Sequence, residues 1–317
     1  LAAKYSREHG TEVDEAREIT VTCGATEAMA AALLAVTNPG DEVLIFEPFY
    51  ENYGPDAILC GATPVWLPLD PSSPLDLDRV RDAVTRRTRA IVINSPNNPS
   101  GRVLSADELH GLAAICMEFD LLAITDEIYE HIVYDGEHLS MRAVEGMRDR
   151  TIMISGASKT FSVTGWRVGW IVAPPDLTSG IRKVHDFLTV GAPAPLQEAC
   201  SVAIESLGPD YYHNLAHAYR ERRDVLAAGL IEAGFRCTPP AGAYYILADF
   251  SAISDEPDDA FARRLARGTA ATPGIAAVPG SSFFHDPVDG RTLLRFAFCK
   301  RLPTLEQAVV RLRALTA

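Results

Sequence analysis

Residues 155–169 read SGASKTFSVTGWRVG, and no other stretch says more about the fold and chemistry of this chain. A short apolar run, residues 151–154, precedes the stretch and predicts a buried strand that ends in a turn of small residues. Lys159 lies just after this run, and Arg167 follows eight positions later. A lysine amine can form a Schiff base with an aldehyde, and an arginine can bind a phosphate group. A lone lysine after a strand is more often a surface residue, so the rest of the chain decides between the two interpretations.

Five further apolar runs alternate with helix-like stretches before residue 175. Near-continuous runs of valine, isoleucine and leucine are typical of strands buried on both faces, which favours an α/β fold with a mostly parallel sheet. These runs are residues 19–22, 42–46, 90–93, 121–125 and 168–172. A capping box, Ser105 with Glu108, predicts the start of the helix before Leu121.

The alternation ends near Pro209. A long amphipathic segment, residues 211–233, is followed by a predicted strand, a helix, two strands and a last helix. We therefore expect a large domain over residues 1–208 and a smaller α+β domain over residues 209–317. The elements expected in the second domain are a strand over 242–249, a helix over 258–267, strands near Ile275 and Leu293, and a helix from Pro303.

The composition excludes several classes of partner. A net charge of −13 with no block of lysine or arginine argues against nucleic-acid binding. No apolar run is long enough to span a membrane, and the six cysteines show no paired or metal-binding spacing, so we expect reduced thiols in a cytoplasmic protein. His213 and His217 are four residues apart but have no third ligand nearby in the sequence, so we expect no metal. Residues 1–10 predict the end of a helix, and we expect an N-terminal segment before Leu1.

Polar residues follow the predicted strands, where ligands bind in open parallel sheets. Gly24, Ala25 and Thr26 lead into a helix, and the free amides there can bind an anion. An ordinary strand–helix turn without a ligand would have the same sequence pattern. Asn98 lies between two prolines that fix the direction of its amide, although a rigid loop without chemistry fits equally well. Asp126 ends the run 121–125 and can pair with a protonated pyridine nitrogen.

Pyridoxal phosphate carries an aldehyde, a phosphate, a pyridine ring and a phenolic oxygen, and the chain offers a partner for each. Tyr129 and Asn98 can donate hydrogen bonds to the phenolic oxygen, and Tyr50 can stack on the ring. Arg295 alternates with apolar residues in a predicted strand, where a guanidinium needs a carboxylate partner. Taken singly, Asp126 could be a helix cap, and Tyr129 and Tyr50 could be packed in the core, as we expect for Tyr244 and Tyr245.

Seven segments together resemble, in order and spacing, those of the class I and II aminotransferases, a family of fold type I enzymes that depend on pyridoxal phosphate. The resemblance runs from about Glu18 to the C-terminus and implies an aspartate-aminotransferase-like fold. The segments are Gly24-Ala25-Thr26, Pro48-Phe49-Tyr50, residues 97–101 (NNPSG), residues 126–129 (DEIY), Ser158-Lys159, residues 166–169 (WRVG) and Arg295-Phe296.

The resemblance assigns a role to each candidate residue. Lys159 resembles the lysine that forms the Schiff base and moves the proton, Asp126 the partner of the ring nitrogen, and Arg295 the clamp on the substrate α-carboxylate. Many members have a serine three residues before the lysine, where this chain has Gly156, with serines at 155 and 158 instead. The remaining expected contacts are Asn98 and Tyr129 at the phenolic oxygen, Asn98 also at the substrate, Tyr50 at the ring, and Gly24, Ala25, Thr26, Ser155, Ser158 and Arg167 around the phosphate.

The resemblance implies an enzyme that transfers an amino group from an L-amino acid to a 2-oxo acid. Within the family, the kynurenine, glutamine, methionine and succinyldiaminopimelate aminotransferases are the most similar members. Tyr50 and Phe284 are candidate walls of the side-chain pocket and favour large neutral or aromatic substrates, with a succinyldiaminopimelate substrate as the alternative. A C–S β-lyase and a non-catalytic effector-binding domain are further alternatives. The family also implies a homodimer with a shared active site, completed by an N-terminal arm.

Overall fold

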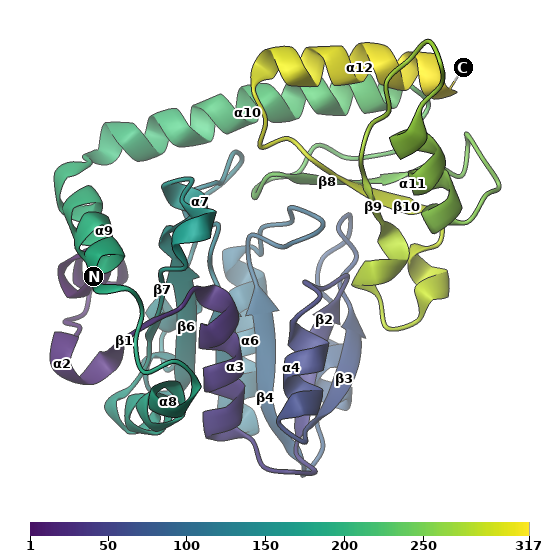
Figure 1. The fold of residues 1–317 in the computed structure, drawn as a ribbon. Coiled ribbons are helices and arrows are strands. Elements are labelled where there is room, and N and C mark those ends of the chain that lie inside the picture. Colours follow the sequence, from purple (N-terminus) through teal and green to yellow (C-terminus); the bar gives the residue numbers. More distant parts are fainter. Residues whose placement is uncertain (317) are drawn as a thin grey trace.

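The computed structural model describes residues 1–316 and contains a large sheet and a small sheet (Figure 1). The large sheet has seven strands in the order β1-β7-β6-β5-β4-β2-β3. The pairs from β6 to β3 are parallel, and β7 runs antiparallel to both β1 and β6. The expected α/β fold with a mostly parallel sheet is therefore confirmed. The strands are β1 (Ile19–Thr22), β2 (Glu42–Glu47), β3 (Thr63–Pro68), β4 (Thr88–Asn94), β5 (Leu122–Asp126), β6 (Thr151–Gly156) and β7 (Gly169–Val172).

Both faces of the large sheet are buried, which explains why its strands read as continuous apolar runs. Val43 and Ile45 of β2 pack on one face with α3, α4 and α8, whereas Leu44 packs on the other face with α6. The capping box predicted at Ser105 and Glu108 is present at the start of α6. The helices on this part of the chain are α1 (Ala2–His9), α2 (Glu15–Glu18), α3 (Ala25–Val36), α4 (Tyr53–Leu59), α5 (Leu77–Asp82), α6 (Ala106–Glu118), α7 (Ala157–Thr160), α8 (Pro175–Leu188) and α9 (Ala194–Ser206).

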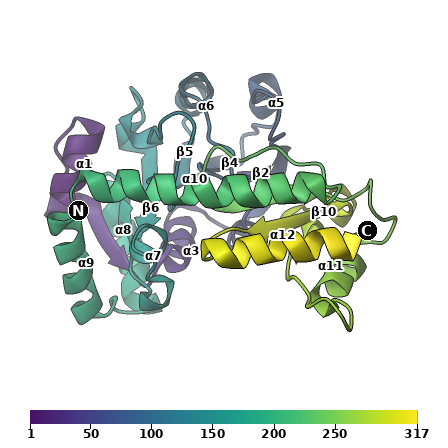
Figure 2. The same cartoon turned by 90° about the horizontal axis from the view of Figure 1, so that it is seen from above.

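The small sheet is antiparallel, with the strand order β8-β10-β9. The long helix α10 crosses from the region of α9 to the small sheet, and α12 lies alongside it (Figure 2). The boundary that we expect between residues 208 and 209 falls where α10 begins, and this division into domains stays a prediction. The elements here are α10 (Pro209–Glu232), β8 (Tyr245–Asp249), α11 (Asp258–Arg267), β9 (Val278–Pro279), β10 (Leu293–Ala297) and α12 (Leu302–Thr316).

Three details of the secondary structure differ from the sequence-based expectation. The edge strand β3 was not predicted, because it contains Pro64 and Pro68 and its residues are mostly partly exposed. The strand expected near Ile275 begins at Val278, and β8 begins at Tyr245 instead of residue 242. The predicted helix end at Gly10 is confirmed, with the glycine in the left-handed conformation.

Within residues 1–316, no helix is both long and apolar enough to cross a membrane. The same residues include no group of three or more histidine, cysteine, aspartate or glutamate side chains that could hold a metal ion.

Candidate active site

A cavity of about 410 Å³ lies at the carboxyl ends of the parallel strands, between the large and small sheets. Asn98 follows β4, Asp126 ends β5, and Lys159 follows β6 in α7. Arg167 precedes β7, and because β7 is antiparallel this residue reaches the same edge. The lining residues are Ala25, Thr26, Met29, Tyr50, Glu51, Asn52, Tyr53, Asn98, Asp126, Ile128, Tyr129, Ser158, Lys159, Thr164, Arg167, Tyr245 and Arg295.

One end of the cavity is suited to an anion. The N-terminus of α3 opens there, with Ala25 and Thr26 lining the space. Gly24 precedes them and does not itself line the cavity among the described residues, but its bare backbone leaves room for Arg167. A Cβ at Gly24 would lie 2.4 Å from the Arg167 guanidinium, so any larger residue would displace that cation. Free helix amides and a guanidinium together form an anion site.

Asp126 presents a buried carboxylate to the same cavity. Its Oδ2 accepts a 2.6 Å hydrogen bond from the Tyr53 hydroxyl, and its Oδ1 accepts one from the Ile128 amide at 3.2 Å. Burial raises the pKa of Asp126, and the hydrogen bond from Tyr53 opposes that change. Asn94 donates to the Asp126 carbonyl oxygen and also accepts from the Asn98 amide, so the two strand ends are tied together.

Lys159 lines the cavity within electrostatic reach of both Asp126 and Arg167. Its pKa is lowered, first by burial, and the neighbouring cations Arg167 and Arg295 lower it further, while Asp126 raises it. Its Nζ lies 5.7 Å from the centre of the Tyr244 ring. A lysine with a lowered pKa is more readily neutral, and a neutral amine can act as a nucleophile or as a base.

Arg295 reaches the cavity from the small sheet. Its guanidinium carbon lies 4.5 Å from the centre of the Tyr245 ring and 4.6 Å from that of Phe283, so the group is held between two aromatic faces. Its Nη1 donates a 2.8 Å hydrogen bond to Asn98 Oδ1. Within residues 1–316 its Nε has no hydrogen-bond partner. Such a guanidinium has donors left for a ligand carboxylate.

Two of the expected residues lie elsewhere. Ser155 is fully buried in β6, where its hydroxyl donates a 2.7 Å hydrogen bond to Glu130 Oε1 and not to the cavity. The structure therefore gives no support to a phosphate contact from Ser155, whereas Ser158 does line the cavity. Phe284 lines a different cavity with Glu47 and Leu69, so the expectation that Phe284 walls the side-chain pocket is wrong.

The structure also explains why a glycine occupies position 156. A Cβ there would lie 3.0 Å from the Val168 carbonyl oxygen and 3.1 Å from the Gly169 Cα. The close approach of β6 and β7 at this point disfavours a side chain.

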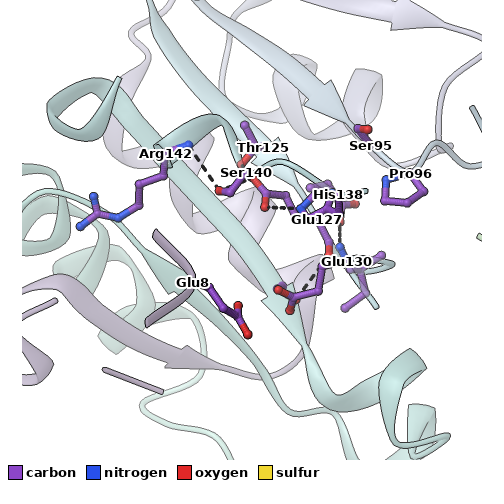
Figure 3. Close-up of polar contacts among 12 residues, drawn as sticks. Glu8, Ser95, Pro96, Thr125, Glu127, Glu130, His138, Ser140 and Arg142 are labelled. Carbon is purple, nitrogen blue, oxygen red and sulfur yellow. Dashed lines mark hydrogen bonds and ion pairs between the residues drawn. The ribbon is translucent and has the colours of Figure 1, made fainter. Parts of the chain in front are cut away.

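A second polar cluster lies beside the cavity and is built around Glu127 and Glu130. We call it the closed cluster, because both carboxylates are hydrogen-bonded to other groups of the protein. Glu127 follows Asp126 directly, and its carboxylate accepts hydrogen bonds from Thr125 at 2.8 Å and Ser140 at 3.0 Å, and lies 2.8 Å from His138 Nε2 (Figure 3). Three residues later, Glu130 accepts from Lys4 at 2.9 Å and Tyr5 at 3.0 Å, besides Ser155. These contacts join α1 to the strands that carry the site.

Among the lining residues that sequence reasoning missed are two tyrosines that contact predicted site residues. Tyr53 begins α4 and touches Asp126, 73 residues away in the chain. Tyr245, which we expected in the core, lines the cavity, and its hydroxyl accepts a 3.1 Å hydrogen bond from Tyr129. Tyr245 could have been found by predicting that its strand pairs antiparallel with the strand of Arg295, because this pairing places the two residues close together.

The chain matches the family described as Aminotransferase class I and II over residues 1–312. It is 42% identical to a probable N-succinyldiaminopimelate aminotransferase of Mycobacterium tuberculosis, covering 99% of this chain and 81% of that protein. It is 36% identical to methionine aminotransferase of Escherichia coli and 34% identical to human kynurenine–oxoglutarate transaminase 1, with the same coverage.

Solved structures of aminotransferases superpose closely on this chain. The N-succinyldiaminopimelate aminotransferase of M. tuberculosis superposes with a TM-score of 0.93, at 42% identity over 99% of this chain and 82% of that one. A tetra mutant of the aspartate aminotransferase of Thermus thermophilus superposes with a TM-score of 0.91, at 33% identity over 99% of this chain and 84% of that one. The chain belongs to the class I and II aminotransferases and has the aspartate-aminotransferase-like fold. It is an aminotransferase, as the seven segments predict.

Proposed function

We propose that the cavity binds pyridoxal phosphate and that the enzyme uses it to transfer the amino group of an L-amino acid to a 2-oxo acid. The observation that carries the proposal is that Asp126, Lys159 and Arg167 line one cavity, although Asp126 and Arg167 are 41 positions apart in the chain. Each supplies a group that this cofactor needs: an amine, a carboxylate and a cation.

The residues present fit the cofactor. Arg167 and the start of α3 would hold the phosphate, because the space at Gly24 brings the guanidinium to the helix amides. Asp126 would keep the ring nitrogen protonated, and Tyr50 would cover the ring. Asn98 uses its Oδ1 to accept from Arg295, so its amide hydrogens remain to donate to the phenolic oxygen.

The chain's own groups would then perform the proton transfers. Bound pyridoxal phosphate supplies an aldehyde that takes up an amino group and a ring that withdraws electrons. Arg295 binds the α-carboxylate of the amino acid and so fixes the position of its Cα. Lys159 Nζ would take the proton from Cα and deliver it to the former aldehyde carbon of the cofactor, C4′, a transfer that its lowered pKa favours. Because one product leaves before the second substrate binds, we expect ping-pong kinetics.

The cavity walls favour a substrate with a large neutral side chain. Tyr50, Tyr53 and Met29 provide aromatic and apolar surface. Among the described residues, the cations that line the cavity are Lys159, Arg167 and Arg295, each with a role already assigned. A second candidate, N-succinyldiaminopimelate, is favoured by the 42% identity to the mycobacterial relative that carries this name.

Two measurements test these proposals. Purified protein with pyridoxal phosphate should show a visible absorption band that Lys159→Ala abolishes, with a loss of activity of at least about a thousandfold. The matched control is Lys183→Ala, at an exposed lysine of α8, which should behave as wild type. A wild-type protein without a visible band, or a band unaltered by Lys159→Ala, would contradict the proposal.

Initial rates on kynurenine, methionine, phenylalanine and N-succinyldiaminopimelate decide the substrate. We expect the neutral substrates to react faster, and Arg295→Ala to raise the KM for all four by about a hundredfold, since each would lose the same carboxylate contact. A strong preference for N-succinyldiaminopimelate would reverse our ranking. Release of pyruvate and ammonia from a cysteine conjugate without any oxo-acid acceptor would indicate a β-lyase instead.

We also propose a homodimer in the cytoplasm. What supports the dimer is a run of exposed apolar side chains at the C-terminal end of α8 and just beyond it, with Phe187 91% and Val190 79% exposed. This run lies close to the site, because Cys23 Sγ is 3.7 Å from the Gly191 carbonyl oxygen. A partner subunit covering it would therefore reach the edge of the cavity. Sedimentation that shows only monomer at micromolar concentration, with cofactor bound, would contradict the dimer.

A further inference from the structure

Tyr245 touches two functional groups of the cavity at once. It is the first residue of β8 and lies opposite Ala297 of β10, so Arg295 is its diagonal neighbour on the adjacent strand. The Arg295 guanidinium carbon lies 4.5 Å from the centre of the Tyr245 ring. At its other end, the Tyr245 hydroxyl oxygen is 3.1 Å from that of Tyr129. The two rings are nearly perpendicular, with centroids 6.0 Å apart.

The hydrogen bond between the two phenols has a consequence once Tyr129 serves the cofactor. A tyrosine hydroxyl donates one proton and accepts through its lone pairs. If Tyr129 gives its single proton to the phenolic oxygen of the cofactor, it no longer has one for Tyr245. The hydrogen bond can then persist only if Tyr245 is the donor. Burial raises the pKa of Tyr129 well above the ordinary tyrosine value, and the neighbouring Tyr245 raises it further, so Tyr129 keeps a proton to give.

We propose that Tyr245 is a positioning residue with two separable actions, which rests on the proposed binding of pyridoxal phosphate. Its hydroxyl donates to Tyr129, which strengthens the donation of Tyr129 to the phenolic oxygen of the cofactor. Its ring supports Arg295 from one face, opposite Phe283, and so holds the guanidinium in position for the substrate carboxylate.

The first action follows from the behaviour of hydrogen-bond chains. A hydroxyl that accepts a hydrogen bond becomes a better donor, so the pair Tyr245–Tyr129 stabilises an ionised phenolic oxygen more than Tyr129 alone. Stabilising the ionised form lowers the pH at which the bound cofactor loses its proton. The second action follows from the stacking of a cation on an aromatic face, which removes freedom from a long side chain before the substrate binds.

Tyr245→Phe isolates the first action, because it keeps the ring and removes the hydroxyl. The visible band of the bound cofactor should remain, but the midpoint of its pH titration should rise by about half to one pH unit. The KM for the amino acid should stay near the wild-type value. The matched control is Tyr134→Phe: its hydroxyl donates to the Ala243 carbonyl oxygen, outside the cavity, and its loss should leave the midpoint unchanged.

Tyr245→Leu tests the second action, because it removes the ring as well. It should show the same rise in midpoint as Tyr245→Phe, together with an increase of about tenfold in the KM for every amino acid substrate. If the KM of Tyr245→Leu equals that of Tyr245→Phe, the ring does not position Arg295, and this half of the proposal is wrong.

A double mutant separates tuning through Tyr129 from a merely structural effect. In a Tyr129→Phe background, the further change Tyr245→Phe should leave the titration midpoint unaltered, because the residue through which it acts is gone. An unchanged midpoint in the single variant, or equal shifts in both backgrounds, would overturn the proposal. A wild-type protein without a cofactor band would instead contradict the proposed function, so the two failures are distinguishable.

Discussion

Asp126 and Glu127 are adjacent in the chain and both are buried, yet they belong to two different regions of the molecule. Asp126 lines the cavity, where Tyr53 and the Ile128 amide occupy only part of the accepting capacity of its carboxylate. Glu127 lies in the closed cluster on the other side of β5, in contact with Thr125, Ser140 and His138. Strand alternation sends the two neighbouring side chains to opposite faces.

The difference distinguishes a functional charge from a structural one. A buried carboxylate surrounded by donors is fully satisfied and stabilises the fold. A buried carboxylate with spare accepting capacity, next to a cavity, is suited to a ligand, and its raised pKa shows that the fold bears a cost for it. The same contrast holds between Ser155, whose hydroxyl is used by Glu130, and Ser158, which faces the cavity.

Within this comparison, the largest effect is expected when each of the two neighbouring carboxylates is replaced in turn by its amide. Asp126→Asn should lower kcat by at least about a hundredfold, because an amide cannot balance a protonated ring nitrogen, while the melting temperature stays the same or rises. Glu127→Gln should instead destabilise the fold by ~1–3 kcal/mol and leave kcat near the wild-type value. Steady-state kinetics and thermal unfolding of both variants measure this. Equal losses of kcat in the two would erase the distinction.

A smaller effect is expected where the closed cluster holds α1. Although burial pushes the pKa of Glu130 upward, Lys4 and its other partners hold that pKa well below the ordinary value of 4.5. Lys4→Met leaves Glu130 charged without its cation and should cost ~3 kcal/mol at pH 7. Because a lowered carboxylate pKa stabilises the fold above pH 4.5 and loses that contribution as the pH falls, the gap between wild type and variant should narrow progressively below pH 4.5.

Urea unfolding across this pH range measures the gap, with Lys183→Met as the control at an exposed lysine. The visible band of the bound cofactor should be unaffected by Lys4→Met. A gap that widens on acidification would mean that the Lys4–Glu130 pair does not act as described.

The smallest effect is expected at Tyr53, which lines the cavity beside Asp126. Tyr53→Phe removes one hydrogen bond to Asp126 and should lower kcat/KM by about tenfold. Since that bond favours the charged carboxylate, the pKa of Asp126 should rise further, and the acid limb of the pH–activity profile should move to higher pH. An acid limb that stays in place or moves to lower pH would show that Tyr53 only packs against the carboxylate.

Much of this could be read from the sequence, because the relevant signals are local. Each strand of the large sheet except β3 was predicted from its apolar run, and the polar residues that follow the runs were expected to share one edge. In the structure Asn98, Asp126, Lys159 and Arg167 line one cavity at that edge. Ser155 and Phe284 lie away from the expected place because the direction of a side chain depends on what packs against it: Ser155 turns to Glu130, and Phe284 faces a separate cavity.

The sequence by itself determined the class of fold and the set of chemical groups at the strand ends, because strand periodicity and the parallel order of the sheet fix both. Only the tertiary structure decided how the small sheet meets that edge. Arg295 meets Asn98 across 197 residues, and Tyr245 meets Tyr129 across 116. Such contacts depend on how α10 carries the second sheet over the first, and no local pattern in the chain encodes that placement. Tertiary packing therefore decides which buried charges are satisfied and which remain available to a ligand.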